Sequence, residues 1–160
     1  MHDPLPADFR LRPLTDDDHA FMARLYALNR QAEMANFPFN EQQKSLFLHS
    51  QFEAQSRHYF DHYPRERFAL IEQQGAPIGR FLVAEFPDQL RLVDIALQPS
   101  HQRLGIGSAL LRQLQAEAAA KGLAIHLQVD PASPARALYE RLGFIAGAGD
   151  ALYLAMTWKS

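Results

Sequence analysis

Two glycines, Gly105 and Gly107, lie between a strand predicted at residues 90–97 and a helix that follows. A phosphate loop of the G-x-x-x-x-G-K type needs a lysine after its last glycine, but Ser108 follows Gly107, so this motif is excluded. A dinucleotide-binding motif would need a third glycine where Leu110 stands, and its strand would come first in the chain rather than fourth. Two interpretations remain. The glycines either form a tight turn or let a phosphate approach unpaired N–H groups at the start of the helix.

The composition is typical of a globular protein with one core. The chain has 160 residues, of which 48% are hydrophobic and 21% charged, and its formal net charge is −2. We therefore expect a single domain over residues 1–160 and no bulk attraction to nucleic acid or to an anionic membrane. There is no cysteine, which excludes disulfides, thiol nucleophiles and cysteine-based zinc sites.

No segment predicts export or membrane insertion. The first residues, MHDPLPADFR, lack the basic start and apolar run of a secretory signal. No apolar stretch approaches the ~18–20 residues that span a bilayer. The sequence thus predicts a cytoplasmic protein with no membrane partner.

The first half of the chain predicts one strand followed by two helices. Residues 9–12 alternate as a short strand, and Thr15 is placed to cap a helix with three aspartates in its first turn. The positions of that helix expected to face the core are Phe21, Leu25, Leu28 and Ala32. A second helix is predicted over residues 41–62, with Leu48, Phe52 and Tyr59 on one face.

The second half is richer in strands. Residues 68–72 and 78–85 predict a hairpin around QQGAP, and residues 90–97 a further strand. The helix after the glycine pair should bury Gly107, Leu111, Leu114 and Ala118 and end at Gly122. Residues 123–129 predict a strand. Ser133 and Pro134 then start a helix that ends at Gly143. Residues 151–158 close the chain as a strand in which Leu152, Leu154, Met156 and Trp158 alternate, and residues 144–145 have room for one more.

This order, β-α-α-β-β-β-α-β-α-β, predicts an α+β fold with helices on the faces of a mixed sheet. Two motifs within it resemble those of the GCN5-related N-acetyltransferase (GNAT) superfamily. QRLGIG, residues 102–107, fits the superfamily's Gln/Arg-x-x-Gly-x-Gly/Ala motif, and ALYERLGF, residues 137–144, is similar to its later helix, which carries a tyrosine. The resemblance extends from about Phe9 to Trp158. It implies a GNAT-like, mostly antiparallel sheet of six to seven strands with about four helices.

The resemblance also implies acetyl-CoA as co-substrate and a primary amine as acceptor, and the residues give no reason to expect a metal. In the superfamily the fourth and fifth strands splay apart and the pantetheine arm pairs with the fourth, which assigns that pairing to the backbone of Ile95 and Leu97. The pyrophosphate would lie on the N–H groups of residues 103–108. The implied cofactor-binding residues are Ile95, Ala96, Leu97, Gln102, Arg103, Leu104, Gly105, Ile106, Gly107, Ser108, Ser133 and Arg136. Two of them depart from the superfamily's pattern, since Ser133 stands where asparagine is frequent and Leu104 where a basic or polar residue is common.

The implied reaction is a direct attack of the amine on the thioester, which needs no protein nucleophile. Tyr139 would protonate the departing thiolate, and an N–H of the fourth strand would hold the thioester oxygen. An amine with a pKa near ~10.4 must lose a proton first, and the candidate bases are Asp94 and a carboxylate-bound water. The alternatives are that Asp94 is an exposed or salt-bridged strand residue and that Tyr139 is a core aromatic.

The acceptor site is less specified. In the superfamily the first two helices wall it, which makes Gln51, Gln55 and Tyr59 candidate contacts, although they could equally be residues of an ordinary amphipathic helix. His58 and His62 are four residues apart, but no third metal ligand is apparent, so we expect a solvated helix face. The acceptor would be a small-molecule or peptide amine, and a homodimer is possible. The rival functions are an acyltransferase using another acyl-CoA, and a CoA-binding sensor or partner-binding module without turnover.

Overall fold

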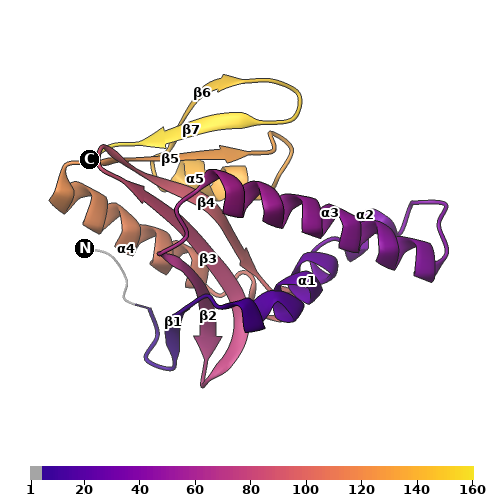
Figure 1. Cartoon of the computed structure of the whole chain (residues 1–160). Helices are drawn as coiled ribbons and strands as arrows, with labels where there is room; N and C mark the ends of the chain where they lie inside the picture. The colour runs from indigo at the N-terminus through magenta and orange to yellow at the C-terminus, as the bar shows by residue number, and fades with distance from the viewer. Residues whose placement is uncertain (1–4) are drawn as a thin grey trace.

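The computed structural model describes residues 5–160 and is built around one twisted sheet of seven strands (Figure 1). The spatial order is β1-β2-β3-β4-β5-β7-β6, and every neighbouring pair is antiparallel except the parallel pair β4–β5. This confirms the α+β fold and the mostly antiparallel mixed sheet. The strands are β1 (Phe9–Pro13), β2 (Phe68–Gln73), β3 (Ala76–Phe86), β4 (Gln89–Leu97), β5 (Ala124–Val129), β6 (Ile145–Gly149) and β7 (Leu154–Trp158).

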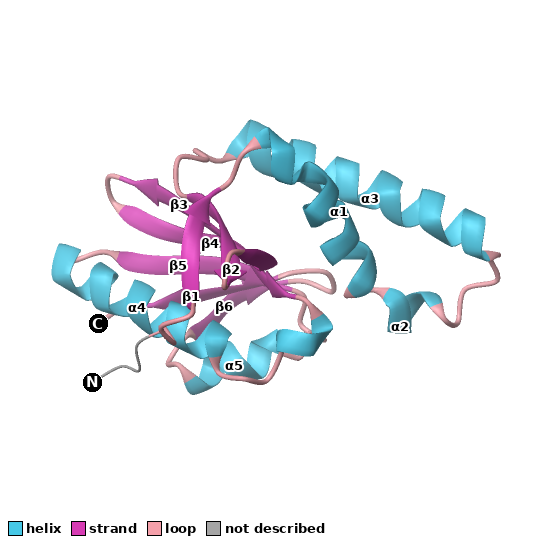
Figure 2. Cartoon of the chain, turned by 90° about the horizontal axis from the view of Figure 1, so that it is seen from below, coloured by secondary structure: helices cyan, strands magenta, loops and turns pink. Residues whose placement is uncertain are grey.

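Helices cover both faces of this sheet (Figure 2). One face carries α1 (His19–Leu28), the single turn α2 (Gln31–Met34) and the long α3 (Glu41–His62), and the other carries α4 (Ile106–Lys121) and α5 (Ala135–Arg141). Two short 3-10 turns, η1 (Asp16–Asp18) and η2 (Pro99–His101), precede α1 and α4. The predicted second helix has the bounds that the sequence suggested, because Asn40 caps it by accepting the N–H of Gln43 at 2.8 Å.

Each face of the sheet has its own apolar core. Phe52 of α3 and Met22 of α1 pack with Leu70 of β2, whereas the neighbouring Ile71 belongs to the core beneath α4. Side chains alternate between the two faces along a strand, so β2 is apolar at successive positions because both of its faces are covered.

The first helical segment differs from the sequence prediction. The chain turns at residues 29–30, so α1 and α2 are separate helices. Leu25 is buried as expected, but Leu28 is 39% exposed and Ala32 is exposed as well. The buried face of α1 is formed by Met22, Leu25 and Tyr26. It therefore shares only Leu25 with the face that the sequence predicted to be buried.

The elements near the C-terminus begin later than predicted. β7 begins at Leu154, and Leu152 is 69% exposed in a turn in which Asp150 accepts the N–H groups of Leu152 and Tyr153. The alternating apolar pattern, which included Leu152, therefore predicted a start for this strand that is three residues too early. The additional short strand exists as β6 and pairs with β7.

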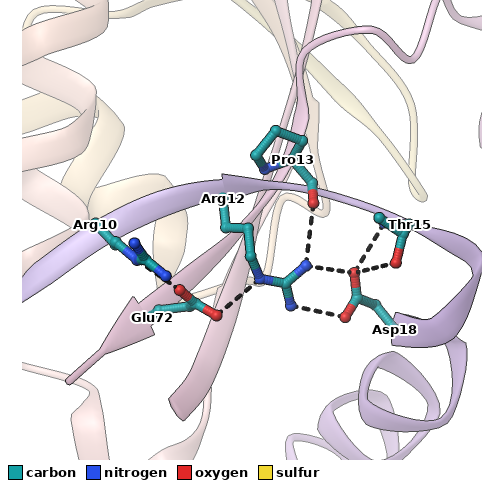
Figure 3. Close-up of polar contacts among 6 residues, drawn as sticks. All are labelled: Arg10, Arg12, Pro13, Thr15, Asp18 and Glu72. Atoms are coloured by element: carbon teal, nitrogen blue, oxygen red, sulfur yellow. Dashed lines mark hydrogen bonds and ion pairs between the residues drawn. The ribbon is translucent and has the colours of Figure 1, made fainter. Parts of the chain in front are cut away.

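Ion pairs join β1, β2 and η1 (Figure 3). The Glu72 carboxylate, whose side chain is 5% exposed, accepts Nε of Arg10 and Nε of Arg12, both at 2.8 Å. Arg12 also contacts both oxygens of Asp18, and Asp18 accepts the N–H of Thr15 at 2.8 Å. The Arg12 guanidinium holds the pKa of both carboxyl groups below the usual range. Thr15 is thus the N-cap residue of this helical segment, and the network fixes where α1 begins.

Candidate active site

β4 pairs with β5 only along its first half. The last pair joins Leu92 to Leu127. On the opposite edge Leu82 pairs with Asp94 but Val83 with Leu92, so Val93 is the extra residue of a bulge. Because a bulge bends a strand away from its previous course, residues 93–97 diverge from β5 and keep one edge open. This is the separation that the resemblance implied.

The open edge exposes the backbone of two residues. Gln98 donates its N–H to the carbonyl of Ile78 on β3, so alternation turns the polar groups of Ile95 and Leu97 away from β3. The Leu97 carbonyl accepts Nδ2 of Asn29 at 3.1 Å and Nε2 of Gln102 at 2.9 Å. Nε2 of Gln102 also donates to Oδ1 of Asn29 at 3.1 Å. The amide of Gln102, one of the implied cofactor-binding residues, is therefore engaged within the protein, where it connects this turn to the end of α1.

The turn between η2 and α4 presents unpaired donors. Arg103 and Gly105 have φ values of 64° and 85°, which reverse the chain just before α4 begins. Within residues 5–160 the N–H groups of residues 103–108 have no hydrogen-bond acceptor, and Ala109 is the first to donate, to the Gly105 carbonyl at 3.0 Å. These donors, together with the positive end of the helix dipole, form an environment that attracts an anion.

These elements enclose a cavity of about 670 Å³. Its walls come from α1, α2, α3, β3, β4, the turn before α4, α4 itself and α5. Four arginines and two carboxylates line it, so its charge favours an anionic ligand. The charged lining residues are Arg30, Glu33, Arg80, Asp94, Arg103 and Arg141.

Tyr139 lies on α5, is largely buried and lines this cavity. The residue is 7% exposed, and its ring packs against Phe144 with centroids 5.7 Å apart. Within residues 5–160 the Tyr139 hydroxyl has no hydrogen-bond partner. It is not fully enclosed, however, because the only fully enclosed side-chain polar atom without a partner in this part of the chain is Oγ of Ser56. Burial, and next the charge of Asp94, raise the pKa of Tyr139, so the phenol remains protonated at neutral pH. A proton donor must be in this state.

α5 is positioned by the residues just before it. Pro134 is its N-cap residue rather than its first helical residue, and Oγ of Ser133 accepts the N–H of Ala135 at 3.2 Å. The helix ends at Arg141, two residues before the predicted end, and Gly143 follows with a φ of 93°.

Asp94 forms a close ion pair with Arg80, which agrees with the alternative interpretation of Asp94 as a salt-bridged strand residue. Its Oδ2 lies 2.7 Å from Nε of Arg80, and Nη2 of Arg80 donates to Oε1 of Gln55 at 2.8 Å. Arg80 is 5% exposed. Sequence reasoning did not select Arg80, although a charged residue within the apolar run IGRFLVAE could have been the signal.

The cavity brings together most of the residues that the sequence singled out. The predicted residues that line it are Gln55, Asp94, Ile95, Ala96, Leu97, Gln102, Arg103, Gly105, Ile106, Gly107, Ser108, Ser133 and Tyr139. Four others do not line it, namely Gln51, Tyr59, Leu104 and Arg136. Leu104 is 64% exposed, and Arg136 forms an ion pair with Glu140 at 2.8 Å. Burial raises the pKa of Tyr59, whose ring lies 5.8 Å from the Arg80 guanidinium.

The sequence missed the contribution of the α1–α2 region. Tyr26, Asn29, Arg30 and Glu33 all line the cavity. Arg30 stacks on the Tyr26 ring, with its guanidinium carbon 3.5 Å from the ring centroid. Nothing in the local sequence pattern distinguishes these residues from an ordinary helix surface.

Other candidate chemistry is not assembled. Within residues 5–160 no group of three or more His, Asp or Glu side chains is placed to hold a metal ion. The His58 and His62 rings lie tilted to one another with centroids 4.4 Å apart, and Nδ1 of His62 contacts the His58 carbonyl. In the same part of the chain, no helix has the length and apolar character to cross a membrane.

A model of the acetyltransferase (GNAT) family matches residues 19–144, so the chain belongs to that family. In a comparison with curated proteins, no sequence matches the chain.

Solved structures share the fold at low sequence identity. The PaiA N-acetyltransferase of Thermoplasma acidophilum, in complex with coenzyme A, has a TM-score of 0.70 and 17% identity, over 95% of this chain and 99% of that one. An acetyltransferase from Thermus thermophilus has a TM-score of 0.67 and 17% identity, over the whole of both chains. The ribosomal-protein-S18-alanine N-acetyltransferase of Escherichia coli has a TM-score of 0.56 and 24% identity, over 93% of this chain and 90% of that one.

Proposed function

We propose that this protein is an N-acetyltransferase that moves an acetyl group from acetyl-CoA to a primary amine by direct attack in a ternary complex. One observation carries the proposal: the open edge of β4, the unpaired N–H groups before α4 and the hydroxyl of Tyr139 all line a single cavity. The amine acceptor is a small molecule or a peptide. The cytoplasmic location and the homodimer stay predictions.

The cavity fits coenzyme A at two places. Residues 103–108 offer N–H groups for the pyrophosphate, and Gly107 keeps the approach clear, since a Cβ there would project toward Ile95 and Leu138. The N–H and C=O of Ile95 and the N–H of Leu97 are open for the amides of the pantetheine arm. The coenzyme A complex of the Thermoplasma acidophilum protein supports this assignment.

In the proposed reaction the amine nitrogen forms a bond to the acetyl carbon and the carbon–sulfur bond breaks. A β4 N–H stabilises the negative charge that develops on the carbonyl oxygen. Tyr139 gives its proton to the departing sulfur, and Asp94 is the candidate that takes the proton lost by the amine. With its pKa raised, the Tyr139 phenol is protonated at neutral pH and has a proton to donate to the departing sulfur.

The test is the release of free CoA thiol from acetyl-CoA with a panel of polyamines, amino acids, peptides and aminoglycosides. Amine-dependent release, with the acetylated amine identified by mass, supports the proposal. CoA binding without turnover on any amine would make the protein a sensor or binding module. Faster transfer from propionyl-CoA or a longer acyl-CoA would instead assign another donor.

A further inference from the structure

Arg80 joins two other polar side chains of the cavity, Asp94 and Gln55, and each of the three keeps one group free. Arg80 uses Nε and Nη2 to bind Oδ2 of Asp94 and Oε1 of Gln55. Within residues 5–160, Nη1 of Arg80, Nε2 of Gln55 and Oδ1 of Asp94 have no hydrogen-bond partner. All three residues line the cavity, and none of these atoms is fully enclosed. The free groups are therefore open to a ligand.

The three groups differ in hydrogen-bonding character. Oδ1 of Asp94 is an acceptor, whereas Nε2 of Gln55 and Nη1 of Arg80 are donors. Because direct bonds link their side chains, an acceptor and two donors lie close together. A complementary ligand carries an N–H donor with an oxygen acceptor beside it.

A simple alkyl amine satisfies only one of these three groups. Its ammonium group can donate to Asp94, but its neighbouring methylene groups offer nothing to Gln55 or Arg80. The Arg80 side chain is 6% exposed and that of Asp94 27%, so closing the cavity over methylene groups would leave donors without water or partner. Leaving such donors unpaired is costly, and a site built for a polar group rejects an analogue that lacks it.

We propose that the acceptor is the α-amine of an α-aminoacyl group, H2N–CHR–C=O, an inference that rests on the proposed function. The amine faces Oδ1 of Asp94, and the neighbouring oxygen faces Nε2 of Gln55 and Nη1 of Arg80. Charge is balanced as well, since Arg80 and Asp94 already neutralise one another and a zwitterionic amino acid adds no net charge. Lysine side chains and polyamines lack the oxygen and are disfavoured.

The test compares three α-aminoacyl acceptors with two alkyl amines. The first group is L-alanine, L-alaninamide and a tripeptide with N-terminal alanine, and the second is isopropylamine and cadaverine. We expect wild-type kcat/KM to be higher for at least one member of the first group than for either alkyl amine. The ranking within the first group distinguishes a free amino acid from an amide or a peptide N-terminus.

Because these amines differ in pKa, the decisive readout is how a variant changes the ratio of kcat/KM for L-alaninamide to that for isopropylamine. Gln55→Leu removes one donor facing the oxygen and should lower this ratio roughly tenfold. Gln55→Glu keeps the size of the side chain but removes its N–H donors, and it should lower the ratio too. Gln42→Leu makes the same change at an exposed position of α3 and should leave the ratio unchanged.

Two results would overturn the inference while the proposed function stands: alkyl amines that are better acceptors than all three α-aminoacyl compounds, or an unchanged ratio in both Gln55 variants when CoA still raises their Tm. Absence of turnover with every amine, in a wild-type protein whose Tm rises with CoA, would overturn the proposed function itself and this inference with it.

Discussion

Gly107 on α4 and Ile95 on β4 face one another so closely that a Cβ on the glycine would lie 3.8 Å from Cδ1 of Ile95. Cδ2 of Leu138 on α5 would lie 4.0 Å from the same Cβ. Both are ordinary van der Waals distances, and the backbone of Gly107 is not in the left-handed region. Space in the cavity, rather than backbone strain, therefore determines the effect of a side chain here.

We predict that Gly107→Val weakens CoA binding by at least about tenfold while the protein still folds. The branched methyl groups would extend into the space through which phosphate approaches the N–H groups of residues 103–108. Isothermal titration with CoA measures the effect, and Gly107→Ala should lose less. Ala119→Val, at an exposed position of the same helix, controls for a general effect of a β-branched residue in α4. Equal CoA affinity in Gly107→Val and wild type would move the phosphate site elsewhere.

Saturating CoA should stabilise the fold. A ligand present at 100 times its Kd adds ~2.7 kcal/mol to the free energy of unfolding. For a domain of this size that corresponds to a rise in Tm of about 5–10 °C, measurable by calorimetry. A melting curve that does not move with CoA or acetyl-CoA at millimolar concentration would contradict the assignment of the cavity.

Tyr139→Phe should lower kcat without changing CoA affinity, because phenylalanine keeps the ring that packs on Phe144 and loses only the proton. General acids contribute ~10²–10⁴-fold, and we expect the low end, since a thiol of pKa ~8.5 already leaves well as its thiolate. The variant's kcat, CoA affinity and Tm should be measured where chemistry limits the rate. A core role predicts the opposite pattern, namely unchanged kcat, so that result would remove Tyr139 from the mechanism.

The sequence predicted the features that depend on local pattern. Strands, helices and the turn at Gly105 follow from spacing, capping and backbone freedom within a few residues. The resemblance to a family then implied a mostly antiparallel sheet whose fourth and fifth strands separate. The stripe that included Leu28 and Ala32 was wrong because the break at residues 29–30 carries neither proline nor glycine, the signals by which a helix end is usually read.

Contacts between distant residues could not be predicted in the same way. Asn29 binds the carbonyl of Leu97, which is 68 residues away, and Arg80 binds Gln55, which is 25 residues away. Each partner alone resembles a surface residue, because the partner that makes it part of the site is distant in sequence. Arg136 does not line the cavity but forms an ion pair with Glu140, and Arg141 lines the cavity.

Away from the cavity, a group of charged residues fastens α4 to the sheet. Arg67 contacts both oxygens of Glu117 at 2.6 and 2.8 Å and Oε1 of Glu85 at 2.8 Å, and Lys121 lies 2.8 Å from Glu117. The Arg67 guanidinium, more than Lys121, lowers the pKa of Glu117 to about 2. The Glu117 carboxylate is therefore part of what holds the C-terminal half of α4 in place.

We predict that this carboxylate makes the fold less stable in acid. The folded pKa of Glu117 lies below its ordinary value of 4.5, so its contribution is fully present above about pH 4.5 and is lost as the pH falls toward 2. Glu117→Gln should therefore lower the free energy of unfolding at pH 7 by about 1–2 kcal/mol, a value reduced for solvent screening of a side chain that is 29% exposed. The difference between variant and wild type should shrink as urea titrations are repeated from pH 5 down to pH 3. Glu140→Gln, which breaks an exposed pair with Arg136, should change stability little at any pH. If the difference in free energy of unfolding between Glu117→Gln and wild type stays constant across this range, then shape or packing, rather than the charge of Glu117, supports α4.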